Sequence, residues 1–112
     1  MVWMKVFYKG KNFAVNAKKL GFFGKLRGLM FRGRDADSLL FEFDKEKEIT
    51  IHSFFCKPFI AAWLDDKHRV NKVLLVNKWL PLISGKGKYL IEIPLNRGNR
   101  KIIDFLVGKR KV

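Results

Sequence analysis

The sequence predicts a mainly β, α+β fold in which a small barrel-like sheet carries two short helices. Seven short segments rich in β-branched and aromatic residues follow one another, separated by turn residues. Two other segments repeat their apolar residues at spacings of three and four, which is typical of amphipathic helices. The chain has 112 residues, of which 48% are hydrophobic, so residues 1–112 are expected to form a single domain around one core.

The N-terminal segment predicts a β-hairpin. Val2–Tyr8 is rich in β-branched and aromatic residues and predicts the first strand. Lys9-Gly10-Lys11 predicts a tight turn, and residues 12–17 predict the returning strand.

Residues 18–30 change period and predict the first short helix. Gly21 and Gly24 each weaken such a helix by about 1 kcal/mol relative to Ala, so we expect packing to hold it. The apolar residues on its predicted stripe are Leu20, Phe23, Leu26 and Met30.

The middle of the chain predicts a run of strands joined by polar turns. Acidic and basic residues alternate in 44–48, and Pro and Gly interrupt 77–87, so both segments predict turns or loops. The predicted strands are 39–43, 49–55, 59–64, 69–76 and 88–93.

A second short helix is predicted for residues 99–107. Asn96 and Asn99 are both suitable residues to cap its start, and Gly108 is placed to end it.

Positive charge is concentrated at the two ends of the chain. The net charge is +14, yet residues 35–85 hold seven cations and eight carboxylates. Residues 1–34 hold nine cations and no carboxylate, and residues 86–112 hold eight cations and two carboxylates. If the two ends meet in space, they form one positive face.

Such a face predicts contact with the phosphate backbone of RNA or DNA, which requires only a positive field and flexible donors. Aromatic residues lie among the cations, notably Phe22, Phe23, Phe31 and Trp79, and an exposed one would stack on bases. The candidate nucleic-acid-binding residues are Lys18, Lys19, Lys25, Arg27, Arg32, Arg34, Lys109, Arg110 and Lys111.

No arrangement of residues predicts a catalytic, metal or cofactor site. His52 and Cys56 are four apart, which on a strand places them about 13 Å from each other, too far to share an ion. Neither histidine has a recognisable triad with Cys56, and Asp65 and Asp66 are expected to stabilise a turn. These observations favour a protein that is not an enzyme.

The lone cysteine, Cys56, has no internal disulfide partner, which favours a reducing compartment. The first residues lack the pattern of a secretory signal, and no run of about eighteen apolar residues exists to span a membrane. We expect a cytoplasmic protein with no membrane partner.

Four segments in order resemble the domain of unknown function 192 family. Gly28-Leu-Met-Phe-Arg32 matches its Gly-Leu-Met-x-Arg signature, and Ser38–Phe43 is similar to its Met-Leu-Phe-x-Phe strand. Residues 52–65 resemble its central segment, and Tyr89–Pro94 resembles a later strand. The resemblance implies a small β-barrel-like fold with short helices, and no particular activity.

The chain departs from that family at several polar positions. Ile60 stands where the family usually has an acidic residue, and Lys109 follows Gly108 where the family tends to have Asp. The run Ile51–Phe55 replaces a Trp-Met-Lys-Asn-Thr run. If those positions form a ligand site in the family, this chain has lost much of it.

Three roles remain open at this point. The first is an accessory module that binds nucleic acid or another polyanion through the basic ends. The second is a small-ligand-binding barrel or an enzyme, with a pocket near Arg32, His52 and Asp65. The third is a structural interaction domain whose basic surface is covered by an acidic protein partner.

Overall fold

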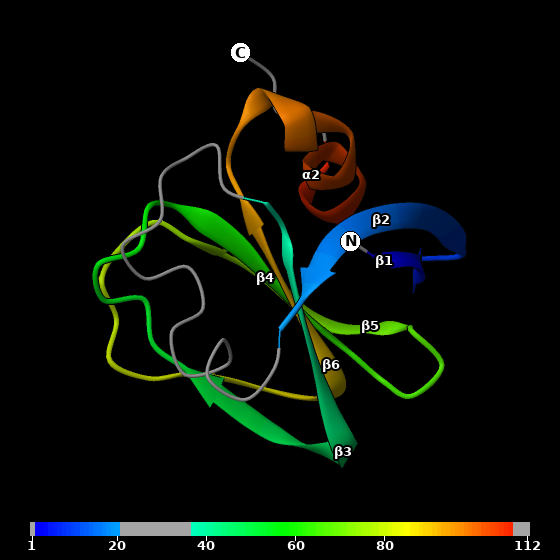
Figure 1. Cartoon of the computed structure of the whole chain (residues 1–112), viewed down its shortest axis with the longest axis horizontal. Coiled ribbons are helices and arrows are strands. Elements are labelled where there is room, and N and C mark those ends of the chain that lie inside the picture. Colours follow the sequence, from blue (N-terminus) through cyan, green and yellow to red (C-terminus); the bar gives the residue numbers. More distant parts are fainter. Residues whose placement is uncertain (1, 21–36, 109–112) are drawn as a thin grey trace.

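The computed structural model describes residues 2–20 and 37–108, and it forms one curled six-stranded sheet with a short helix (Figure 1). The strand order across the sheet is β1-β2-β3-β6-β4-β5. The elements are β1 (Val2–Tyr8), β2 (Lys11–Lys19), β3 (Leu39–Ile51), β4 (Phe59–Leu64), β5 (Val70–Val76), β6 (Ile83–Pro94), the 3₁₀ turn η1 (Arg97–Asn99) and α2 (Arg100–Val107).

The two edges of the sheet meet, so the sheet curls into a half barrel. β1 lies at one edge and β5 at the other. A parallel bridge joins Phe7 to Arg69, and the Phe7 N–H donates to the carbonyl oxygen of His68 at 3.0 Å. The prediction of a mainly β, barrel-like sheet is therefore confirmed.

The predicted hairpin is confirmed, and its second strand is longer than expected. Lys9 and Gly10 have φ values of 51° and 76°, as a two-residue hairpin turn requires, and glycine adopts this conformation without steric cost. Lys18 and Lys19 belong to β2, so the prediction that a helix starts at 18 is wrong. Their backbone pairs in parallel with Leu39 and Leu40, which supplies the hydrogen bonds that a helix would otherwise provide. The rest of that predicted helix, from residue 21, lies outside the described residues.

β4 is buried on both faces and separates two apolar cores. Ile60, Ala62 and Leu64 face a core shared with the hairpin and α2, while alternate residues face a second core. The second core contains Phe59, Ala61, Trp63, Leu39, Phe41, Ile49, Val76, Ile83 and Leu90. Alternation of faces along a strand explains this division, because successive side chains point to opposite sides.

Two predicted turns are strands. Residues 44–48 continue β3 as an exposed, charged stretch with a register shift between Glu42 and Lys47, and residues 83–87 begin β6. Gly85 and Gly87 are therefore strand residues that allow close packing. A Cβ on Gly87 would lie 2.7 Å from the carbonyl oxygen of Leu64.

β3 ends at Ile51, so the expected strand over 52–55 is a turn, in which Phe55 has a φ of 61°. Buried Ser53 joins this turn to the 77–82 loop. Its hydroxyl donates to the carbonyl of Lys78 at 2.5 Å and accepts from the N–H of Leu80 at 2.6 Å. The rings of Phe55 and Trp79 lie 5.0 Å apart above this junction.

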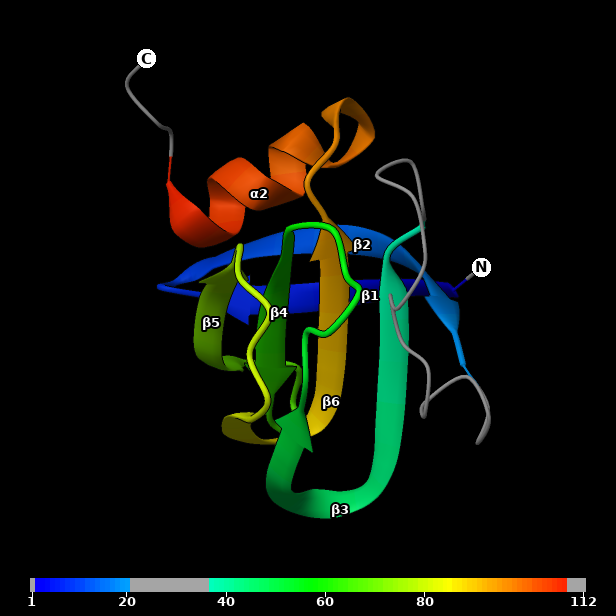
Figure 2. The same ribbon diagram turned by 90° about the vertical axis from the view of Figure 1, so that its left-hand side faces the viewer.

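The C-terminal helix is confirmed as α2, and it packs on the hairpin (Figure 2). Asn96 caps η1 by accepting from the N–H of Asn99 at 3.1 Å, and Gly108 ends α2 with a φ of 82°. Ile102 and Leu106 are buried against the core. In Figure 2 the hairpin runs across the direction of β3, β4 and β6, with α2 along β2.

Candidate nucleic-acid interface

The two ends of the described chain meet at Phe105. Its ring lies 5.5 Å from that of Phe13 on β2 and 6.3 Å from that of Tyr8 on β1. Lys101 precedes Phe105 by four residues, so both lie on the same side of α2. The hairpin and α2, the described parts of the two basic ends, therefore pack against each other.

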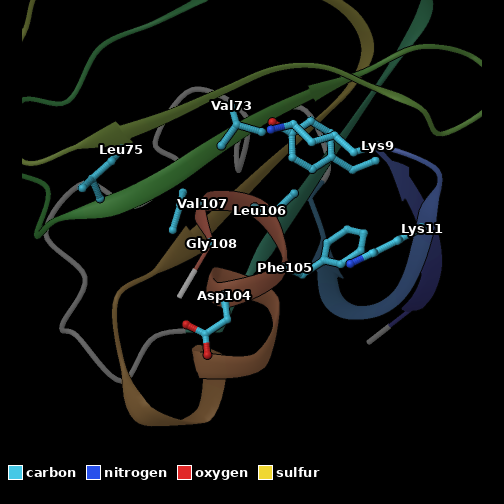
Figure 3. Close-up of a pocket in the computed structure, with 10 residues that line it drawn as sticks. Lys9, Lys11, Val73, Leu75, Asp104, Phe105, Leu106, Val107 and Gly108 are labelled. Carbon is cyan, nitrogen blue, oxygen red and sulfur yellow. The ribbon is translucent and has the colours of Figure 1, made fainter. Parts of the chain in front are cut away.

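A groove of about 710 Å³ opens where these elements meet (Figure 3). Lys9 and Lys11 reach it from the hairpin, and Asp104 on α2 lies at its other end. Its remaining lining is mainly apolar, from β5 and the end of α2: Val73, Leu75, Phe105, Leu106 and Val107. The Lys9 ammonium is held 5.2 Å from the centre of the Tyr8 ring.

A second groove, of about 470 Å³, lies on the other side of the hairpin tip. Phe7, Lys9 and Gly10 line it from the hairpin, and Lys67 and Arg69 line it from the turn before β5. Lys9 therefore lies between two grooves, and three cations surround the second one.

The Asp65 carboxylate holds the turn that carries Lys67 and Arg69. It accepts from the backbone N–H groups of both residues at 2.9 Å and from Nε of Arg69 at 2.7 Å. Burial raises the pKa of Asp65, but these hydrogen bonds and the Arg69 charge outweigh it and hold that pKa below its ordinary value. Asp65 thus positions two cations at the groove.

The outer face of the hairpin is aromatic and basic. Trp3, Lys5 and Phe7 alternate with buried Met4 and Val6 along β1, so they point away from the core. Trp3 is 72% exposed and Phe7 is 40% exposed. Across the hairpin they face residues without charge: Asn16, Ala14 and Asn12.

Of the predicted nucleic-acid-binding residues, Lys18 and Lys19 lie at the end of β2 far from the tip. Lys18 is exposed on the outer face, two residues beyond Asn16, the partner of Trp3. Lys19 forms an ion pair with Glu42 at 2.8 Å, which raises the pKa of Lys19. The other predicted cations lie outside the described residues: Lys25, Arg27, Arg32, Arg34, Lys109, Arg110 and Lys111.

The predicted pocket near Arg32, His52 and Asp65 stays a prediction, because Arg32 lies outside the described residues. The other two side chains follow strands that pair with β6 at different levels. His52 follows Ile51, the partner of Ile83, whereas Asp65 follows Leu64, the partner of Tyr89. Six residues of β6 separate these levels, about 20 Å along a regular strand. Neither His52 nor Asp65 lines the two grooves at the hairpin tip.

Five cations of the hairpin and the 65–69 turn were not among the predicted binding residues: Lys5, Lys9, Lys11, Lys67 and Arg69. Lys5 had a signal in the sequence, because it is the charged residue within the predicted strand Val2–Tyr8, and a lysine is rarely buried. Lys67 and Arg69 had no such signal in the sequence, since they are about sixty residues after the hairpin turn. Only the curl of the sheet brings them beside that turn.

Elsewhere in residues 2–20 and 37–108, no three His, Cys, Asp or Glu side chains are grouped to hold a metal ion. Burial, followed by the charge of Glu92, raises the pKa of Cys56 to about 11. The Cys56 thiol donates to the carbonyl of Phe54 at 3.6 Å. In the same described ranges, no helix is long and apolar enough to cross a bilayer.

The fold and the surface define a class: a small half-barrel protein whose N-terminal hairpin is basic and aromatic on its outer side. No protein-family model matches the chain, and no curated protein matches its sequence.

Two solved structures share the fold. One, described as a "putative transcription regulator" from Sinorhizobium meliloti 1021, is 17% identical with a TM-score of 0.68, covering 88% of this chain and 81% of that one. The other is a protein of unknown function from Novosphingobium aromaticivorans DSM 12444, 15% identical with a TM-score of 0.68, covering 90% of this chain and 77% of that one. At these identities the likeness concerns the fold alone.

Proposed function

We propose that this protein binds nucleic acid as a small accessory module, through the basic surface of the hairpin and the neighbouring 65–69 turn. The observation that carries the proposal is the meeting of the hairpin, α2 and the 65–69 turn around Lys9. This hairpin surface is formed by Lys5, Lys9, Lys11, Lys18, Lys67 and Arg69.

The charge on this surface is largely uncompensated. Among the described residues, the four lysines of the hairpin surface that lie on residues 2–18 form no ion pair. The first 34 residues contain no carboxylate, and Asp104 on α2 is the acidic residue that shares the larger groove with Lys9 and Lys11. Exposed cations without partners attract polyphosphate and release its counterions on binding, which favours association at low salt.

The test measures binding of a fluorescent RNA and a fluorescent DNA duplex across a salt titration. Lys9, Lys11 and Lys67 are replaced together by Glu. Each phosphate contact contributes about −0.9 to the slope of log affinity against log salt on duplex. We expect the variant to bind at least about tenfold more weakly, with a slope shallower by about 2–3.

A matched variant carries the same charge change elsewhere. Lys45, Lys57 and Lys78 are also exposed, and none lines either groove. Replacing these three lysines by Glu is expected to lower the logarithm of the affinity by less than half of the decrease in the Lys9, Lys11 and Lys67 variant. Equal losses in the two variants mean that net charge alone attracts the polyanion, and absence of salt-dependent binding to either probe contradicts the proposal.

A second candidate function rests on the 710 Å³ groove. Its volume is within the range of small-molecule sites, about 300–1,000 Å³. Lys9 and Lys11 beside Leu75 and Leu106 suit an anionic ligand with an apolar body. A screen of aliphatic carboxylates and phosphates by thermal shift tests it, and a shift abolished by Lys11→Glu, a change at an exposed lining residue, supports it.

A further inference from the structure

We infer that the outer face of the hairpin binds single-stranded nucleic acid, with bases stacked on Trp3 and Phe7. This inference rests on the proposed function and specifies its partner. Figure 2 shows the strands concerned, β1 and β2, running together across the half barrel.

The outer face alternates cations and rings along one line. Trp3, Lys5 and Phe7 occupy every second position of β1, so neighbours in this series are about 6.6 Å apart. Lys18 lies diagonally beyond Trp3, and Lys9 follows Phe7 in the second groove. Along this face the order is therefore Lys18, Trp3, Lys5 and Phe7, so cations that can contact the phosphate backbone lie beside rings on which bases can stack.

Within residues 2–20 and 37–108, Trp3 and Phe7 do not belong to either apolar core. The core side of β1 is filled by Met4 and Val6, which are buried. Trp3 is 72% exposed, so most of its large ring surface adds nothing to the stability of the fold by burial. A base stacked on Trp3 covers that apolar surface and leaves Lys5 free to contact the phosphate.

The chemistry of the face favours a single strand over a duplex. Duplex bases are already stacked on each other and present no free ring face, whereas unpaired bases stack on aromatic side chains whatever their sequence. Asn12 and Asn16 lie opposite Phe7 and Trp3, and their amides are suited to the edges of unpaired bases.

The same face is a poor contact for a second copy of the chain. A two-fold dimer through the hairpin would bring Lys5 and Lys18 against equivalent lysines, with no carboxylate in residues 1–34 to offset them. Charge complementarity therefore points to an anionic polymer.

The experiment compares a fluorescent single-stranded oligonucleotide, oligo(U) or oligo(dT), with a duplex of the same length and with heparin. Trp3→Leu and Phe7→Leu are the test variants. Trp79→Leu is the matched control, because Trp79 is 59% exposed on a loop outside the hairpin. We expect Trp3→Leu to weaken single-strand binding about tenfold and to leave heparin binding unchanged, since stacking contributes to the first and charge to the second.

Intrinsic fluorescence adds a direct readout. In the Trp79→Leu variant, Trp3 is the exposed tryptophan and Trp63 is fully buried, so quenching on addition of oligo(U) reports on Trp3. We expect quenching that is lost in the Trp3→Leu, Trp79→Leu double variant. Thermal unfolding of each variant checks that the fold is intact.

Each remaining outcome is decisive. If single strands bind no more tightly than duplex, the inference is wrong although the proposed function stands. The same holds if Trp3→Leu weakens single-strand binding no more than Trp79→Leu does. Failure of oligonucleotides, duplex and heparin alike to bind removes the proposed function itself. A concentration-dependent dimer abolished by Trp3→Leu overturns the inference in favour of self-association.

Discussion

The indole of Trp63 on β4 lies directly against the backbone of Gly85 on β6. A Cβ built on Gly85 would lie 2.5 Å from Cδ2 of Trp63. The same indole donates from Nε1 to the carbonyl of Ile49 on β3 at 3.1 Å. One buried side chain therefore joins three adjacent strands, and a glycine is required where the ring meets β6.

Gly85→Ala is expected to destabilise the fold strongly. The added methyl overlaps the ring of Trp63, which is fully buried and has no room to move. Overpacking of this kind costs about 1–3 kcal/mol in free energy of unfolding. Urea denaturation measures it, with Gly98→Ala as the control, because a Cβ there meets its nearest neighbour at 3.4 Å. Equal stability of the two variants contradicts the close contact.

Ser53→Ala is expected to loosen the junction of the 52–56 turn and the 77–82 loop. The change removes the hydroxyl that serves both the Lys78 carbonyl and the Leu80 N–H. Leaving such buried groups unsatisfied costs about 1–3 kcal/mol. Hydrogen exchange of the Leu80 amide should accelerate more than exchange of the amides in β4. Unchanged protection of Leu80 would show that the hydroxyl is dispensable.

Asp65→Asn is expected to lower stability at neutral pH by about 1–3 kcal/mol, because the carboxylate receives three hydrogen bonds, two of them from Arg69. The folded-state pKa of Asp65 lies below its ordinary value, so its contribution is complete above an unfolded pKa of about 3.9. The contribution is lost as the pH falls through the folded pKa.

The stability difference between wild type and Asp65→Asn should therefore shrink as the pH falls from 7 to about 3, where unfolded aspartate becomes protonated. Urea unfolding at several pH values measures this difference. Asp66→Asn, an exposed position in the same turn, controls for removal of one negative charge. A difference that stays constant through the acid range would contradict the linkage.

Cys56 is expected to react slowly with iodoacetamide. Its pKa of about 11 in the folded protein leaves little thiolate at pH 8, since burial disfavours the charged form. The alkylation rate should be on the order of 100-fold lower than in the urea-unfolded chain, where the pKa is about 8.5. Mass spectrometry of the native and unfolded protein measures both rates, and rapid native alkylation would contradict the shifted pKa.

Local pattern was sufficient for much of the fold. β-branched and aromatic residues predicted β1 and β4 with the bounds that the structure shows, and Asn96 and Gly108 were correctly placed at the ends of the C-terminal helical segment. These features depend on steric and hydrogen-bonding preferences within a few residues, which a single sequence displays directly.

Local pattern failed where a distant partner decided the outcome. The charged residues 44–48 and the glycines 85 and 87 suggested turns, yet they lie in the neighbouring strands β3 and β6, where Lys47 pairs with Gly87 and Ile49 with Gly85. The Trp63 ring explains Gly85 and the Leu64 backbone explains Gly87, and each lies more than twenty residues away along the chain. Propensity for a turn was overridden by packing across the sheet.

The candidate interface divides in the same way. The sequence by itself determined that both ends are basic and that Val2–Tyr8 is a strand, because composition and β propensity are local properties. Only the tertiary structure placed Lys67 and Arg69 beside Lys9, and Phe105 beside Phe13. The physical reason is the curl of the sheet, which brings its edge strand β1 to the residue before its other edge strand β5, at Phe7 and Arg69. This curl has no signature in any short stretch of the chain.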